Sequence, residues 1–213
     1  MVNLGIDESY AIERMRTLIL HPEFPGESYA WYLTSSSDSL IATTRDLIFC
    51  ASDTGTYEIQ LRIHDEQNPV SHSFKIVVWE EQVAYSPYIS KVLEYNPAPG
   101  QFVNTMPLYE QGDTYETMRR KAEESISGTN NTLISLGAWG GYVTFAFDHS
   151  VVNTPNQSDF LIEGNSFYAS ATSKGGSSEP GIVTVSIDIN QNGLPDDPFY
   201  QLAGSEYYTP STL

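Results

Sequence analysis

Polar and apolar residues alternate strictly along residues 57–64, Tyr-Glu-Ile-Gln-Leu-Arg-Ile-His. Successive side chains of a β-strand point to opposite faces, so this segment predicts a half-buried strand. Its apolar face consists of Tyr57, Ile59, Leu61 and Ile63. Shorter apolar runs separated by turn-forming residues predict further strands over residues 17–20, 29–33, 46–51 and 74–79. Regular short strands of this kind favour a β-sandwich for the first part of the chain.

The chain changes character after residue 80, where Tyr-Ser-Pro-Tyr and then Asn-Pro-Ala-Pro-Gly lead up to residue 100. Because proline and glycine interrupt regular structure, we expect no strand or helix over residues 81–100. A boundary is therefore predicted near residues 81–85, between a first domain of residues 1–82 and a second of residues 83–213. Alternation resumes in the second domain, and the predicted strands are 142–147, 181–188 and a returning strand at 199–202.

One helix is predicted in the second domain, over residues 113–127. Asp113 is the expected N-cap, and Glu116 three residues later completes a capping box. Gly128 is the expected stop signal. Three apolar residues recur at helical spacing, Met118, Ala122 and Ile126. The polar face carries Arg119, Arg120 and Lys121, and we interpret it as a solvated face rather than an anion site.

The first domain combines Tyr-Ala-Trp at 29–31, Asp-Thr-Gly-Thr-Tyr at 53–57, and a closing strand at 74–78. By this combination it resembles the PKD (polycystic kidney disease) domain, an immunoglobulin-like module. The resemblance covers roughly residues 1–80. His64-Asp65 matches only partly the Asn-Asp type of pair that usually follows the long strand of the family. The resemblance implies that Trp31 is a core residue, which is also the ordinary role of a strand tryptophan.

The charge of the chain is strongly acidic, because 27 Asp and Glu oppose 10 Lys and Arg, for a formal net charge of −17. Such a surface repels phosphate backbones and anionic membranes, so we expect no nucleic-acid partner. The single cysteine, Cys50, lies in an apolar run and is interpreted as a small buried hydrophobe. No apolar run is long enough to span a bilayer.

Residues 188–197, Asp-Ile-Asn-Gln-Asn-Gly-Leu-Pro-Asp-Asp, have the ligand spacing of a calcium loop. Ca²⁺ takes six to eight oxygen ligands, which such loops supply from alternate positions with a glycine at the sharp bend. The expected ligands are Asp188, Asn190, Asn192, the carbonyl of Leu194, Asp196 and Asp197, with Gly193 at the bend. We therefore predict bound Ca²⁺.

Two features of this loop depart from an EF-hand. Phe199 occupies the twelfth position, where an EF-hand has a bidentate Glu, and no helix-forming stretch flanks the loop. Asp197 is the candidate for the missing charge. The competing interpretation is an ordinary polar hairpin loop, because Asn-Gly and Pro-Asp form turns without a metal.

Several motifs mark residues 95–208: NPAPGQFVN at 96–104, LGAWGGYV at 136–143, Phe-Asp-His at 147–149, Gly-Asn-Ser-Phe at 164–167, Ser-Glu-Pro-Gly at 178–181, and the calcium-like loop through Gly-Ser-Glu-Tyr at 204–207. By these motifs the segment resembles the C-terminal module of exported surface proteins of Bacteroidetes. It implies a jelly-roll-like β-sandwich with one helix, in a module that continues beyond residue 213. The whole chain is then mainly β, with an immunoglobulin/PKD-like sandwich first.

The same resemblance implies an extracytoplasmic protein at the outer-membrane surface, held there by a lipid anchor absent from this chain. Such proteins occur with outer-membrane uptake systems, so the expected partner is a glycan, a corrinoid-type ligand or another surface protein. An accessory, non-catalytic role in nutrient capture follows from it. A structural or adhesive spacer and a glycan-active hydrolase are the alternative functions.

Catalytic motifs are missing from the sequence. It has no Gly-x-Ser-x-Gly elbow, no phosphate-binding Gly-x-x-x-x-Gly-Lys loop and no His-Glu-x-x-His motif. The best local pair is Asp148-His149, but adjacent strand residues point to opposite faces, so we expect Asp148 not to orient His149. We therefore predict no catalytic residues.

A binding role is favoured by the 14 tyrosines and by Trp139, whose neighbours Gly137, Gly140 and Gly141 leave room around the indole. Aromatic faces suit sugar rings and other flat, partly apolar ligands. The expected ligand-binding residues are Trp139, Tyr142, Asn165 and Glu179. The alternatives are that Trp139 packs in the core, and that Asn165 and Glu179 make turn hydrogen bonds or join Asp148 in a second polar or metal centre.

Overall fold

The computed structural model describes residues 3–35, 38–172 and 175–204. It divides into two compact units, Met1–Ser86 with Phe147–Asp159, and Pro87–Ala146 with Phe160–Leu213. The chain first passes from one unit to the other after Ser86, just beyond the domain boundary expected at residues 81–85. The segment Phe147–Asp159 differs from the expectation, because it belongs to the first unit although the sequence places it inside the second domain. Residues 205–207 of the Gly-Ser-Glu-Tyr motif lie outside the described residues.

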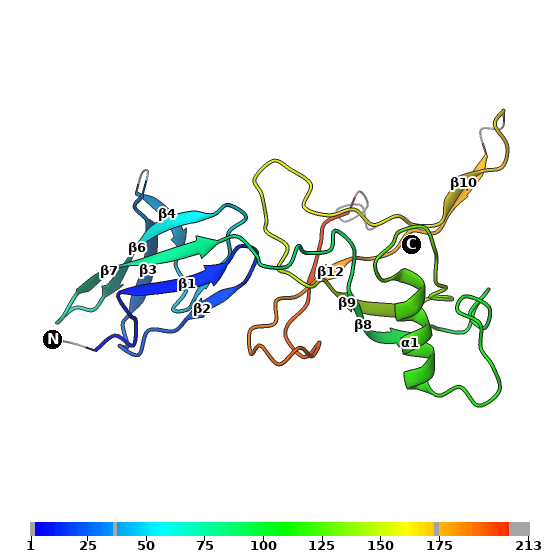
Figure 1. The fold of residues 1–213 in the computed structure, drawn as a ribbon, viewed down its shortest axis with the longest axis horizontal. Helices are drawn as coiled ribbons and strands as arrows, with labels where there is room; N and C mark the ends of the chain where they lie inside the picture. The colour runs from blue at the N-terminus through cyan, green and yellow to red at the C-terminus, as the bar shows by residue number, and fades with distance from the viewer. Residues whose placement is uncertain (1–2, 36–37, 173–174, 205–213) are drawn as a thin grey trace. The chain divides into compact units, whose positions relative to one another are not determined.

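The first unit contains a five-stranded sheet and a two-stranded sheet (Figure 1). The larger sheet has the order β1-β7-β6-β3-β4, made of β1 (Ser9–Glu13), β7 (Val70–Trp79), β6 (Gly55–His64), β3 (Ser28–Leu33) and β4 (Ser39–Ala42). The smaller sheet pairs β2 (Leu18–Leu20) with β5 (Leu47–Phe49). All pairs are antiparallel except β1 with β7, which is parallel. A single apolar core joins the two sheets.

The core of this unit follows the alternation seen in the sequence. Ile59, Leu61 and Ile63 of β6 are buried, Tyr57 is half-buried against them, and Trp31 of β3 is 0% exposed. The indole Nε1 of Trp31 donates to the carbonyl of Thr44 at 3.0 Å, so its polar atom is satisfied inside the core. The prediction of a core tryptophan is therefore confirmed. Cys50 is half-buried rather than buried, and burial raises the pKa of its thiol.

The second unit consists of small sheets and one described helix. Its pairs are β8 (Lys91–Asn96) with β9 (Tyr142–Ala146), β10 (Ser166–Tyr168) with β11 (Gly176–Ser178), and β12 (Thr184–Val185) with β13 (Tyr200–Gln201). The expected strand at 181–188 is thus much shorter than its alternation suggests. A mainly β chain with one helix among the described residues is confirmed. The jelly-roll arrangement stays a prediction, because the described pairings of this unit are two-stranded.

Strand β8 contradicts the expectation that residues 81–100 hold no regular element. It pairs with β9, and the register shifts between Val92 and Glu94, which indicates a β-bulge. A bulge adds one residue to a strand and breaks its two-residue period. Val92 and Tyr95 are therefore both buried although they are three residues apart. Because of this irregular spacing, alternation of polar and apolar residues does not predict the strand.

Helix α1 (Tyr115–Ile126) lies close to its predicted range, but its cap is different. The hydroxyl of Thr114, not the carboxylate of Asp113, accepts from the backbone N–H of Thr117 at 3.3 Å. Asp113 instead pairs with Lys121 at 2.7 Å. No helix in the described part of the chain is long and apolar enough to cross a membrane.

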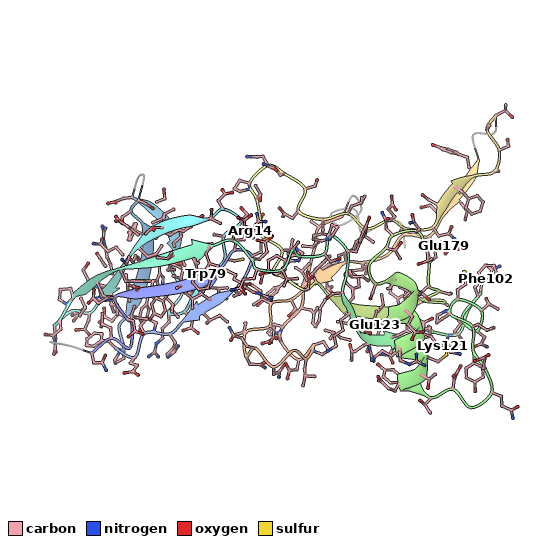
Figure 2. The ribbon with its side chains drawn as sticks, viewed as in Figure 1. Arg14, Trp79, Phe102, Lys121, Glu123 and Glu179 are labelled. Carbon is pink, nitrogen blue, oxygen red and sulfur yellow. The ribbon has the colours of Figure 1, made fainter. Side chains whose placement is uncertain are left out.

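The polar face of α1 is not simply solvated, contrary to the expectation. Arg119 donates to the carbonyl of Val92. Glu123, labelled in Figure 2, accepts from the backbone N–H of Val92 at 2.9 Å. Arg119 also pairs with Glu123 at 2.9 Å. Two helix side chains thus satisfy both backbone groups of Val92 at the bulge, where the strand ladder is interrupted. Of the three basic residues, only Arg120 is mainly exposed.

Candidate functional site

The buried phenol of Tyr95 connects the β8–β9 ladder with two loops of the second unit. Tyr95 is 1% exposed, and its hydroxyl donates to the carbonyl of Ser135 at 2.7 Å. The carbonyl of Met106 lies 3.4 Å from the same hydroxyl and accepts from the backbone N–H of Ser135 at 2.7 Å. Burial raises the pKa of Tyr95, so the hydroxyl keeps its proton and remains a donor. The loops over residues 97–106 and 134–141 are therefore joined at one point.

Glycines bring the backbones of these loops into direct contact. A Cβ at Gly137 would lie 1.8 Å from the carbonyl oxygen of Ala98, and Gly137 has a left-handed φ of 74°. A Cβ at Gly141 would lie 1.7 Å from the carbonyl oxygen of Leu136. The N–H of Ala98 donates to the same carbonyl of Leu136 at 3.0 Å. No other residue fits Gly137 or Gly141 without movement of the backbone.

Trp139 lies at the tip of the turn that these glycines form, and its side chain is 83% exposed. The alternative in which Trp139 packs in the core is therefore wrong. Tyr142, which begins β9 opposite Asn96, is 46% exposed. The structure thus presents two of the expected ligand-binding aromatics at the surface of the second unit.

Asn165 and Glu179 lie on a different element from Trp139. They flank the β10–β11 hairpin, where Ser166 pairs with Ser178, and both are exposed. Figure 2 labels Glu179. Asp148, the third member of the expected polar centre, belongs to the first unit. Asn165 and Glu179 are therefore assigned to a hairpin end and not to the surface around Trp139.

Asp148 and His149 contradict the expectation that they cannot interact. Nδ1 of His149 lies 2.8 Å from Oδ1 of Asp148, and this contact lowers the pKa of Asp148. Strand β9 ends at Ala146, so the rule of opposite faces does not apply to the two residues that follow Phe147. The N–H of Ser86 donates to Asp148 at 3.0 Å, and the ring of His149 stacks on Tyr85 with centroids 5.1 Å apart.

These contacts hold the segment after β9 on the first unit. A cavity of about 290 Å³ lies beside them, with Glu13, Arg16, Tyr85 and Asp148 among its lining residues. The hydroxyl of Tyr85 donates to Glu13 at 3.1 Å, and the guanidinium of Arg16 lies 5.0 Å from the centre of the Tyr85 ring. The polar groups around the cavity are thus engaged with one another. The contacts among these polar groups account for the position of the segment that follows β9.

The calcium-like loop brings its predicted residues together. Both carboxylate oxygens of Asp188 accept backbone N–H groups, from Asn192 at 3.0 Å and from Gly193 at 2.8 Å. The side-chain amides of Asn190 and Asn192 donate to Asp196 at 3.2 and 2.9 Å. These two hydrogen bonds, first that from Asn192, lower the pKa of Asp196. The side chains expected to bind the ion therefore converge within one exposed loop.

Hydrogen bonds within the loop also stabilise it as a polar turn. Asp197 accepts from the N–H of Ile189 at 3.1 Å, and Asn192 Oδ1 accepts from the N–H of Leu194 at 2.7 Å. No group of three or more His, Cys, Asp or Glu side chains that could hold a metal ion is found among the described residues. Ca²⁺ would need the amide oxygens of Asn190 and Asn192, which accept backbone N–H groups, to turn toward the ion beside Asp196.

Comparisons with known proteins give little further information. No protein-family model matches the chain, and no curated protein matches it. One solved structure that it resembles is a quinonprotein alcohol dehydrogenase-like protein from Bacteroides thetaiotaomicron, with 18% identity and a TM-score of 0.30. The match covers 44% of this chain and 20% of that protein. A similarity at this level carries no argument about fold or function.

The packing of the Trp139 turn can be tested with two alanine substitutions. Gly137 and Gly140 both have positive φ angles, but a Cβ at Gly140 would meet open space. Gly140→Ala should cost about 1–2 kcal/mol of unfolding free energy, from the left-handed backbone alone. Gly137→Ala should cost about 1–3 kcal/mol more, because its methyl group overlaps the Ala98 carbonyl. Chemical denaturation measures both changes, and equal losses would contradict the proposed contact.

Proposed function

We propose that the second unit is a non-catalytic ligand-binding module of an extracytoplasmic surface protein. The observation that carries the proposal is the 83% exposure of Trp139 on a turn fixed by glycine contacts. A tryptophan of a soluble domain normally buries most of its large apolar surface. An indole held in solvent by a close-packed turn is therefore best explained by a ligand that covers it.

The ligand class follows from the ring and from the charge of the chain. Aromatic faces stack on the apolar faces of sugar rings and on other flat, partly apolar ligands. A net charge of −17 repels polyanions, which favours a neutral ligand. A glycan fits both conditions, and a corrinoid-type ligand is the alternative within the same role. Capture of such a nutrient at the outer-membrane surface is the function that we propose.

The first unit favours a second role, that of a spacer. Its most conspicuous aromatic side chain, Trp31, is fully buried, and Tyr57 packs against the same core. These two aromatic side chains are thus used for packing. We propose that this unit carries the binding module without contacting the ligand.

The test of the binding function is a pair of tryptophan substitutions. Wild-type protein is screened on a glycan array and titrated with the best glycan and, separately, with cobalamin. Trp139→Ala should weaken binding by about tenfold or more, equivalent to roughly 1.4 kcal/mol. Trp79→Ala removes a partly exposed tryptophan of the first unit and should leave the affinity unchanged. Equal affinity of wild type and Trp139→Ala would contradict the proposal.

We also propose that the loop over residues 188–197 binds Ca²⁺ in a structural role. Support comes from the convergence of Asp188, Asn190, Asn192 and Asp196 in one loop. Asp188, Asp196 and Asp197 are all acidic, and a divalent ion would remove their mutual repulsion. The loop joins β12 to β13, so bound Ca²⁺ would stabilise that pair of strands. Mg²⁺ fits less well, since it requires near-ideal octahedral geometry.

The calcium proposal is tested by thermal melts in Ca²⁺ and in EDTA. Saturating Ca²⁺ should stabilise the folded chain by about 3–4 kcal/mol at concentrations of about 100–1,000 times the dissociation constant. Asp188→Ala should abolish this response, whereas Glu124→Gln, which removes a carboxylate from the exposed side of α1, should retain it. Identical midpoints in Ca²⁺ and EDTA would establish the loop as an ordinary polar turn.

A further inference from the structure

Phe102 combines two unfavourable features on the loop that packs against the Trp139 turn (Figure 2). Its side chain is 52% exposed, and its φ of 63° is left-handed. A bulky residue at positive φ is uncommon, because its Cβ crowds the backbone, and glycine or asparagine is the ordinary choice there. Backbone strain of this kind persists where the surrounding structure fixes it, and it gathers at functional sites.

The surroundings of Phe102 fix its backbone firmly. Its carbonyl accepts from the N–H groups of Thr105 at 3.0 Å and Met106 at 2.9 Å, and from the hydroxyl of Thr105 at 3.1 Å. These bonds hold the turn that follows Phe102, and they would hold it equally around an asparagine. The phenyl ring contributes nothing to them. Its presence at an exposed position is therefore not explained by the turn.

The residues on either side connect this turn to the one that bears Trp139. The hydroxyl of Ser135 donates to the carbonyl of Gln101 at 2.7 Å. A Cβ on Gly137 would lie 2.9 Å from the side chain of Val103, and one on Gly100 would lie 2.6 Å from the backbone nitrogen of Ala138. Residues on both sides of Phe102 thus touch the stretch of chain that leads to Trp139.

The loops that carry these rings are free of charge. Residues 97–109 and 125–147 contain no Asp, Glu, Lys, Arg or His, although the chain as a whole has a net charge of −17. Exposed amides and hydroxyls are present instead, among them Gln101, Asn104 and Thr105. Aromatic rings on loops whose own residues are uncharged hydrogen-bonding groups match the surface of a neutral sugar chain, which alternates apolar ring faces with hydroxyl groups.

We propose that Phe102 is a second stacking subsite, and that the ligand is a neutral oligosaccharide long enough to contact both Phe102 and Trp139. This inference rests on the proposed binding function and specifies its ligand. A short ligand contacts Trp139 alone, while a longer one gains the second ring. Affinity therefore increases with chain length, and the increase depends on Phe102.

The experiment compares disaccharides with hexasaccharides of the β-glucan, α-glucan, xylan and mannan series by calorimetric titration. Phe102→Asn removes the ring and tolerates the left-handed backbone, so the loop is retained. It should weaken hexasaccharide binding by about tenfold and leave disaccharide binding unchanged, whereas Trp139→Ala should weaken both. Leu108→Ala, at another exposed apolar position of the same charge-free stretch, is the matched control and should change neither.

The outcomes separate this inference from the proposed function. Hexasaccharides that bind no more tightly than disaccharides would refute the second subsite. It is also refuted if Phe102→Asn retains wild-type affinity for both ligands while Trp139→Ala does not. In either case the binding role of Trp139 is retained. If wild-type protein binds none of these saccharides, the neutral-oligosaccharide ligand is refuted. Binding of cobalamin in that case would preserve the Trp139 platform with a different ligand.

Discussion

A buried phenol must keep its hydroxyl hydrogen-bonded, and in the second unit this requirement determines where two loops lie. Tyr95 is almost fully enclosed, and the carbonyl of Ser135 accepts its proton at 2.7 Å. Leaving that pair unmade would cost about 1–3 kcal/mol, which is a large fraction of the stability of a small domain. Because Ser135 is also bonded to Met106, the requirement extends to both loops. The position of Trp139 depends on this constraint.

The constraint itself depends on an irregularity of β8. The bulge between Val92 and Glu94 leaves Leu93 outside the register with β9 and turns Tyr95 toward the same interior as Val92. Arg119 and Glu123 of α1 bond the backbone of Val92 beside the bulge. The helix thus stabilises the bulge, the bulge directs Tyr95 inward, and Tyr95 joins the loops. Gly137 and Gly141 then allow the backbones to approach, which leaves the indole of Trp139 in solvent.

The sequence alone predicted an element correctly where a single local pattern determined it. Alternation located β6, and helical spacing located α1, because each pattern extends over several residues. Prediction from the sequence was wrong where a second interaction overrode the local pattern. The bulge concealed β8, the hydroxyl of Thr114 replaced Asp113 as the helix cap, and the end of β9 at Ala146 freed Asp148 to contact His149. The positive φ of Phe102 is a backbone feature that no residue pattern in the sequence predicts.

The most direct test of this account is hydrogen exchange of the Tyr95→Phe variant. The substitution keeps the ring and removes only the hydroxyl. The account predicts faster exchange at the N–H groups of Ser135 and Ala98, which bond to Met106 and Leu136 between the loops, with unchanged protection along the β8–β9 ladder. Equal exchange at Ser135 and Ala98 in the variant and the wild type would contradict the claim that Tyr95 holds the surface around Trp139.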